Sequence, residues 1–271
     1  MSPARSDRCR VEHVMGMPVA MDVRDDGIAD ALVDAAFEWL RWVDRTFSTY
    51  RADSDIARLN RGECDEADVD VRVREVLEAC RALKRRTGGA FDAEAAARAP
   101  EVRARPGAGD GRPGAVEPAG YVKGWAAAEA WTILAAGGVR NAMVEAGGDL
   151  LVRGRPAPGE RWRVGIQHPR LDDRLAAVLE LGDMAVATSG TYRRGQHIVD
   201  PATGGRPSGV LSVTCVGVDL AVADALATAG FAMGRDGAAW LAAQPDVEAM
   251  VVFDDDTIRL TPGFDALRVP D

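Results

Sequence analysis

The chain has 271 residues, of which 47% are hydrophobic and 28% are charged. This is the composition of an ordinary globular protein rather than a disordered or fibrous one. The formal charge of −9, from 33 Lys and Arg against 42 Asp and Glu, argues against nucleic-acid binding, which normally needs a basic face. The four cysteines are scattered, so neither a zinc site nor a disulfide framework is indicated. The length is compatible with one large domain or with two closely packed lobes.

The first part of the chain predicts a strand and two helices. Residues 11–23 alternate apolar and polar positions like a strand, and residues 29–47 have the spacing of an amphipathic helix. A polar loop follows at 47–62, and a second helix at 71–89 is stopped by a glycine pair. The N-terminus lacks an apolar run of signal-peptide length, and 18 consecutive apolar residues occur nowhere, so we expect a cytoplasmic protein without membrane insertion.

Residues 98–120 form a segment dense in Pro, Gly and Ala. It is too long for a simple connection within a compact domain, which leaves a mobile lid or a flexible insertion. We favour the insertion because the segment contains little that could pack.

The rest of the chain alternates helices and strands. A mixed α/β fold with much antiparallel pairing is therefore expected. The pattern predicts a helix at 123–138, strands at 141–154, 161–169, 175–190 (two strands) and 210–218, a helix at 220–234 and a hairpin at 247–264 that turns on Asp254–Asp256.

Asp224 and Thr228 are the first candidate site residues. They are four positions apart, so on a helix they lie on one face, one turn from each other. A carboxylate and a hydroxyl are hard ligands suited to Mg²⁺, which takes substrate phosphate oxygens to complete its coordination. The alternative is a solvated aspartate and a hydroxyl that bonds back to the preceding helical turn.

His197 is the second candidate. It opens the turn-rich stretch HIVDPATGG, where a histidine can titrate near neutral pH and shuttle protons. The alternative is a surface loop histidine. Glycine pairs recur along the chain, but none belongs to a GxGxxG or Walker motif, so Rossmann and P-loop folds find no support.

Taken in order from Met15 to Gly234, a series of short motifs resembles the ApbE family of FAD:protein FMN transferases. The motifs are MGMPVAM, FSTYRADSDIARLN, TGGAFD, YVKGWAA, NAMVEAGGDL, WRVGIQHP, VATSGTYRR, HIVDPATGG and ADALATAGFAMG. The resemblance implies a single domain over residues 1–271, with mixed, largely antiparallel sheets flanked by helices in two intimate lobes. It also implies an Mg²⁺-dependent enzyme that cleaves FAD, attaches FMN through a phosphoester to a threonine of a target protein and releases AMP. The alternatives are a pyrophosphatase that gives free FMN and AMP, or a non-catalytic flavin-binding protein.

The resemblance also assigns site residues. Asp224, Thr228 and the backbone carbonyl of Gly120 would hold the Mg²⁺, and Asp224 and His197 would be catalytic, with His197 giving acid/base help beside the diphosphate. The residues implied to bind FAD are Met15, Tyr50, Ala90, Phe91, Asp92, Glu117, Lys123, Thr188, Ser189, Gly190, His197 and Ile198.

The main departure from the family pattern precedes the Lys-Gly pair at Lys123. The family usually has an Asp-Leu-Gly run there, whereas this chain has Glu117, Pro118 and Ala119. Glu117 can still accept hydrogen bonds from FAD, but the longer acid changes their geometry and the Pro118 ring stiffens the approach. The departure bears on how the adenosine end of FAD would bind.

Overall fold

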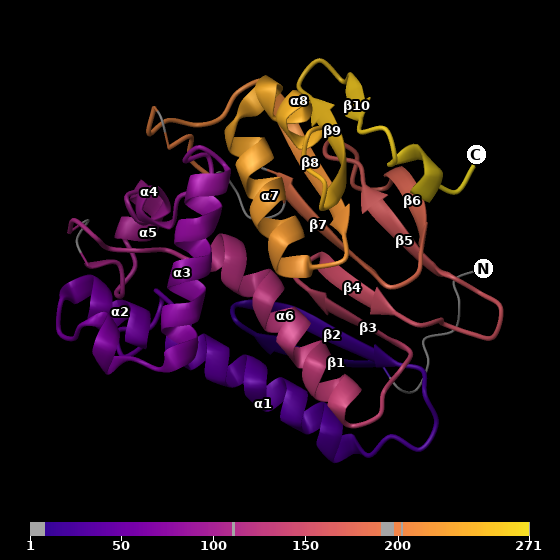
Figure 1. Cartoon of the computed structure of the whole chain (residues 1–271), viewed down its shortest axis with the longest axis horizontal. Helices are drawn as coiled ribbons and strands as arrows, with labels where there is room; N and C mark the ends of the chain where they lie inside the picture. The colour runs from indigo at the N-terminus through magenta and orange to yellow at the C-terminus, as the bar shows by residue number, and fades with distance from the viewer. Residues whose placement is uncertain (1–8, 110–111, 191–197, 202, 271) are drawn as a thin grey trace.

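The computed structural model describes residues 9–109, 112–190, 198–201 and 203–270. Its centre is an eight-stranded sheet whose neighbouring strands are all antiparallel, in the order β1-β2-β3-β4-β7-β8-β9-β10 (Figure 1). A separate antiparallel pair is formed by β5 and β6. The strands are β1 (Cys9–Val14), β2 (Met17–Val23), β3 (Ala142–Ala146), β4 (Asp149–Arg153), β5 (Trp162–Gln167), β6 (Leu175–Leu181), β7 (Met184–Gly190), β8 (Val210–Gly217), β9 (Val247–Phe253) and β10 (Ile258–Leu260).

Helices cover one face of the large sheet, mainly α1, α3, α6 and α7 (Figure 1). The larger hydrophobic core lies between these helices and the sheet. Among the described residues, no helix is long and apolar enough to cross a membrane. The helices are α1 (Asp30–Phe47), α2 (Asp55–Arg61), α3 (Val71–Arg86), α4 (Ala93–Ala97), α5 (Pro100–Arg103), α6 (Ala119–Ala136), α7 (Leu220–Ala232) and α8 (Gly237–Leu241).

Side-chain alternation gives the large sheet two buried faces. On β9, Val251 packs into the core under the helices, whereas Met250 and Val252 pack into a second core against β5 and β6. Successive strand residues point to opposite faces, so one apolar run serves both cores. The mixed fold with largely antiparallel sheets and flanking helices is thus confirmed, including the closing hairpin of β9 and β10.

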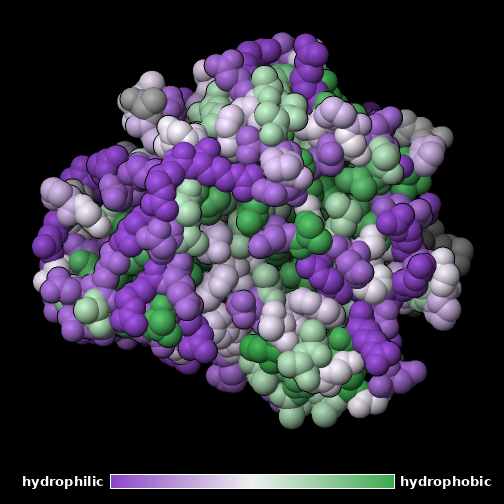
Figure 2. Space-filling view, in the orientation of Figure 1, coloured by the Kyte–Doolittle hydropathy of each residue, from purple (hydrophilic) through white to green (hydrophobic). Residues whose placement is uncertain are grey.

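On the face seen in Figure 2, hydrophilic side chains dominate over the region of α2 to α5. Hydrophobic ones gather at the lower end of the view, where α1 begins and α6 ends in Figure 1. Leu32 belongs to this end and packs so closely on Gly137 that a methyl group there would lie 2.3 Å from Leu32 Cδ2. The ends of α1 and α6 are therefore in close contact.

Two element predictions were wrong in detail. Residues 11–23 form a hairpin instead of one strand, because Met15 and Gly16 both have left-handed φ angles, 57° and 70°, as a two-residue turn requires. The apolar alternation continues across such a turn and hides it. Within the expected polar loop lies α2, capped by Ser54, whose Oγ accepts a hydrogen bond from the Ala57 N–H at 3.1 Å, and ended by Gly62 with φ 68°.

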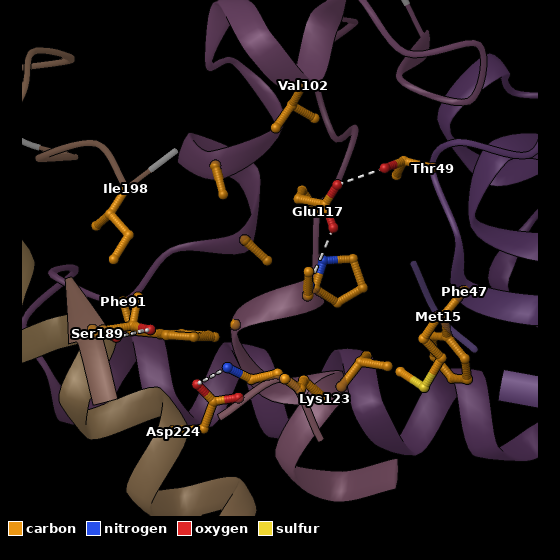
Figure 3. A pocket seen from close by; sticks show the side chains of 18 of the residues that line it. Met15, Phe47, Thr49, Phe91, Val102, Glu117, Lys123, Ser189, Ile198 and Asp224 are labelled. Atoms are coloured by element: carbon orange, nitrogen blue, oxygen red, sulfur yellow. Dashed lines mark hydrogen bonds and ion pairs between the residues drawn. The ribbon is translucent and has the colours of Figure 1, made fainter. Parts of the chain in front are cut away.

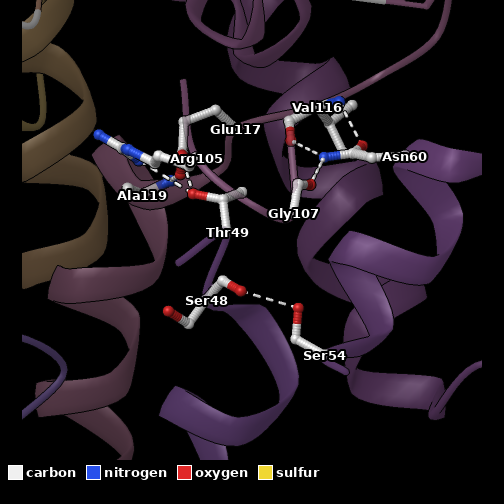
Figure 4. Close-up of polar contacts among 9 residues, drawn as sticks. All are labelled: Ser48, Thr49, Ser54, Asn60, Arg105, Gly107, Val116, Glu117 and Ala119. Carbon is white, nitrogen blue, oxygen red and sulfur yellow. Dashed lines mark hydrogen bonds and ion pairs between the residues drawn. The ribbon is translucent and has the colours of Figure 1, made fainter. Parts of the chain in front are cut away.

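The Pro/Gly-rich segment at 98–120 contains α5 and the first residues of α6, which begins four residues earlier than predicted. Asn60 binds the segment at Gly107 and Val116 (Figure 4). Its Nδ2 donates hydrogen bonds to the carbonyls of both residues at 3.0 Å, and its Oδ1 accepts one from the Val116 N–H at 2.8 Å. The premise that the segment has little to pack is wrong, since it buries Ala99, Val102 and Ala108. Its flexibility stays a prediction.

Candidate functional site

A cavity of about 610 Å³ opens where the helix ends meet the turns of the large sheet (Figure 3). Its size lies within the range of about 300–1,000 Å³ common for small-molecule sites. Every predicted site residue that the structure describes lines it: Met15, Tyr50, Ala90, Phe91, Asp92, Glu117, Gly120, Lys123, Thr188, Ser189, Gly190, Ile198, Asp224 and Thr228. His197 lies outside the described residues.

The α7 helix brings Asp224 and Thr228 to the cavity one turn apart, as their spacing predicts. The Asp224 side chain is buried, and Thr228 Oγ1 shares a hydrogen bond of 3.2 Å with Ser189 Oγ at the end of β7. Gly120 is close by, since a methyl group built on it would lie 3.6 Å from Thr228 Oγ1. Three oxygen-bearing residues from two helices therefore meet at one wall of the cavity.

Lys123 lies between two buried carboxylates. Its Nζ forms an ion pair with Asp149 Oδ2. It forms another, at 3.4 Å, with Asp224 Oδ1 (Figure 3). Gly124 makes this geometry attainable, because α6 approaches the start of α7 so closely that a methyl group there would lie 2.6 Å from the Leu220 carbonyl oxygen. The Lys-Gly pair thus serves helix packing as well as charge placement.

Asp149 is absent from the sequence-based prediction, although it belongs to the motif NAMVEAGGDL. It is 2% exposed, and its Oδ1 accepts a hydrogen bond from the Thr188 N–H at 3.0 Å while Oδ2 pairs with Lys123. Thr188 Oγ1 continues the network to Thr214 Oγ1 at 2.9 Å. A carboxylate directly after a glycine pair was the available signal, but only the packing of α6 against β4 brings it to Lys123.

The oxygen atoms at this wall are of the kind that a hard cation prefers. Asp224 is buried there, with the Thr228 hydroxyl one helical turn away. The described residues contain no group of three or more His, Cys, Asp or Glu side chains that could hold a metal. A metal here would rest on the mixed oxygen set of Asp224, Thr228 and the Gly120 carbonyl, completed by water and phosphate as Mg²⁺ prefers.

The predicted flavin cradle has two sides. Met15 lies with Phe47 on one side of the cavity, and Phe91 lies across from them beside Ser189 (Figure 3). The backbone of Met15 has a left-handed φ of 57°, which is uncommon for a residue other than glycine and is often found at functional sites. Tyr50 is 68% exposed, so its ring is available at the mouth.

Asp92, which is predicted to contact the flavin, also has structural contacts within the protein. Its Oδ1 accepts from the N–H groups of Glu94 at 2.9 Å and Ala95 at 3.2 Å, which caps α4. Its Oδ2 pairs with Lys84 Nζ at 3.0 Å, and this hydrogen bond raises the pKa of the Lys84 ammonium. Both oxygens of Asp92 therefore already have protein partners.

Glu117 is buried at the other end of the cavity and holds three elements together (Figure 4). Its Oε1 accepts from the Ala119 N–H at 3.2 Å, which caps the start of α6. Its Oε2 accepts from Thr49 Oγ1 at 2.6 Å and forms an ion pair with Arg105. Thr49 and Arg105 are both absent from the sequence-based prediction, because no local pattern links positions so far apart. The glutamate that departs from the family pattern is thus held by Thr49, Arg105 and the Ala119 N–H.

The chain is similar to known proteins both in sequence and in structure. Residues 15–103 and 102–251 match the model of the ApbE family. An FAD:protein FMN transferase of Vibrio cholerae serotype O1 is 38% identical over 149 residues, which are 51% of this chain and 44% of the relative. One of Rhodobacter capsulatus is 37% identical over 152 residues, 52% of this chain and 29% of the relative. The matched region thus spans less than half of either relative.

Solved structures match over nearly the whole chain. The ApbE protein of Thermotoga maritima superposes with a TM-score of 0.84 at 25% identity, covering 97% of this chain and 99% of that one. The flavin transferase ApbE of Vibrio cholerae gives 0.81 at 26% identity, covering 96% and 98%.

Proposed function

Since this chain belongs to the ApbE family, we propose that it is an FAD:protein FMN transferase. In this proposal it cleaves FAD, attaches FMN through a phosphoester to a threonine of a target protein and releases AMP. The observation that carries the proposal is the gathering of residues from distant motifs around one cavity with a buried carboxylate, Asp224, in its wall.

The reaction moves one phosphoryl group. The threonine oxygen of the acceptor forms a bond to the FMN-side phosphorus, and the bond from that phosphorus to the bridging oxygen breaks, so the electron pair leaves with AMP. The hydroxyl proton passes to a base, a role that we assign to His197.

In the proposal, Asp224, Thr228 and the Gly120 carbonyl hold Mg²⁺. When bound there, the ion would supply Lewis-acid stabilisation of the charge on the pyrophosphate and the AMP leaving group. The protein's own part is to orient the Asp224 carboxylate, with which Lys123 forms an ion pair. Asp149 in turn orients Lys123.

The test combines FAD, Mg²⁺ and a candidate acceptor protein, with flavin fluorescence of the acceptor band and chromatography of free nucleotides as readouts. A fluorescent acceptor together with AMP supports transfer. Free FMN and AMP without labelling would instead indicate hydrolysis, and intact FAD would exclude both reactions. Asp224→Asn should abolish turnover but retain FAD binding, whereas the matched exposed variant Asp236→Asn should behave as wild type. Unchanged turnover in Asp224→Asn would contradict the assigned metal role.

A further inference from the structure

Arg105 lies just after α5, in the segment at 98–120, and lines the cavity. Its side chain is only 14% exposed. Its Nη1 donates to Thr49 Oγ1 at 2.9 Å and pairs with Glu117 Oε2. One guanidinium therefore ties this segment to the end of α1 and to the start of α6.

The flat face of Arg105 covers an aromatic ring. Its Cζ lies 4.3 Å from the centroid of Tyr50, which is within cation–π distance. Tyr50 is largely exposed and lines the cavity, and Arg105 is a contact for its ring there. A planar ligand entering the cavity would meet a ring that is already held.

The Nε–H of Arg105 is buried and has no hydrogen-bond partner among the described residues. A buried donor without a protein partner is uncommon, and such groups commonly bind a ligand or an ordered water. Because Arg105 lines the cavity, an acceptor atom of a bound molecule could complete its hydrogen bonds.

Arg105 also decides the charge at this end of the cavity. Glu117 is 8% exposed, and without the guanidinium its carboxylate would be a buried, unpaired negative charge in the wall of a cavity proposed to take an anionic nucleotide. With Arg105 in place the pair is neutral. The glutamate at this position is thus compatible with an anionic nucleotide only together with its arginine.

We propose that Arg105 is a nucleotide-positioning residue that neutralises Glu117, holds the Tyr50 ring and offers its Nε–H to bound FAD. This inference rests on the proposed function for the identity of the nucleotide. It does not require turnover, because FAD binding can be measured in the absence of Mg²⁺ and acceptor.

The experiment measures the FAD dissociation constant by isothermal titration calorimetry for wild type, Arg105→Met, Glu117→Gln and the double variant. Arg105→Met should weaken FAD binding by about tenfold or more, since a buried carboxylate loses its partner. The double variant should recover part of that loss, because it removes the unpaired carboxylate but restores neither the ring contact nor the Nε–H. Arg103→Met, an exposed arginine on α5, is the matched control and should bind FAD as wild type does.

Wild-type affinity in folded Arg105→Met would overturn the proposal, and so would a double variant that binds as weakly as Arg105→Met. If Arg105→Met fails to fold, Arg105→Lys provides the test, because it keeps the charge but lacks the Nε–H and the flat face. The lysine variant should show an intermediate loss, and wild-type affinity there would refute the stacking and donor roles. FAD binding without turnover by the wild type would defeat only the transferase proposal, whereas no binding at all would defeat both.

Discussion

Gly124→Ala should separate α6 from α7 and so disturb the site from within the core. The added methyl would lie 2.6 Å from the Leu220 carbonyl oxygen and 2.9 Å from Ala221 Cα. Both are backbone atoms, so no side-chain rotation relieves the clash. For the methyl group to reach ordinary contact with this oxygen at 3.4 Å, the two helices must move apart by about 0.8 Å.

Two opposing terms set the stability change. Overpacking of this kind costs about 1–3 kcal/mol, whereas replacing glycine by alanine inside a helix gains about 1 kcal/mol. The net loss should therefore be about 0–2 kcal/mol. The effect on catalysis should be larger, because Lys123 precedes Gly124 and pairs with Asp224, and a displacement near 1 Å can cost about 100-fold in rate.

The assay is FAD cleavage alongside thermal unfolding. The matched control is Gly230→Ala in α7, where the nearest obstacle is the side chain of Leu241 at 2.6 Å, which can move. We expect a turnover loss of about 10-fold or more in Gly124→Ala and a smaller one in Gly230→Ala. Full turnover in Gly124→Ala would refute the claim that this helix contact positions Lys123.

Two substitutions and the reactivity of one native thiol test other parts of the structure. Asp149→Asn keeps a hydrogen-bond acceptor for the Thr188 N–H but removes the charge paired with Lys123. It should therefore lower the free energy of unfolding by about 1–3 kcal/mol and slow FAD cleavage. Urea melts and cleavage rates equal to those of the wild type would contradict this. Burial opposes ionisation of Asp25, but hydrogen bonds from Asn141 and from the Arg140 N–H lower the pKa of this carboxyl below its ordinary value of 3.8. The ionised Asp25 therefore stabilises the fold above pH 3.8, and this stabilisation is lost as the pH falls through the lowered pKa. Asp25→Asn should therefore destabilise most near neutral pH, and an equal loss in acid melts would count against this. Cys80 is buried and burial raises its pKa to about 12, so the native protein's thiol should resist Ellman's reagent until unfolding; rapid reaction at this position would show otherwise.

Helical periodicity was sufficient to predict the local half of the site. The spacing of Asp224 and Thr228 already implies a shared helix face, and both line the cavity. The sequence also predicts most strands of the large sheet, since their alternating runs are long. The turn at Met15 escapes prediction because apolar alternation continues through a two-residue hairpin.

The other half of the site depends on long-range contacts. Glu117 meets Thr49, which is 68 positions away, through side chains that no periodic pattern connects. Arg105 lies in a segment whose Pro/Gly-rich composition suggests a lack of packing, yet Asn60 fastens that segment by its side-chain amide. Asp149 is visible in the sequence, but its partner Lys123 becomes apparent only when β4 and α6 are placed together.

The central claim is Mg²⁺-dependent cleavage of FAD with FMN delivered to a threonine. The most direct test is mass spectrometry of an acceptor protein incubated with this chain and FAD, with and without Mg²⁺, while released AMP is quantified. We expect FMN on an acceptor threonine and an equal amount of AMP, both only when Mg²⁺ is present. Intact FAD and an unmodified acceptor in the presence of Mg²⁺ would contradict it.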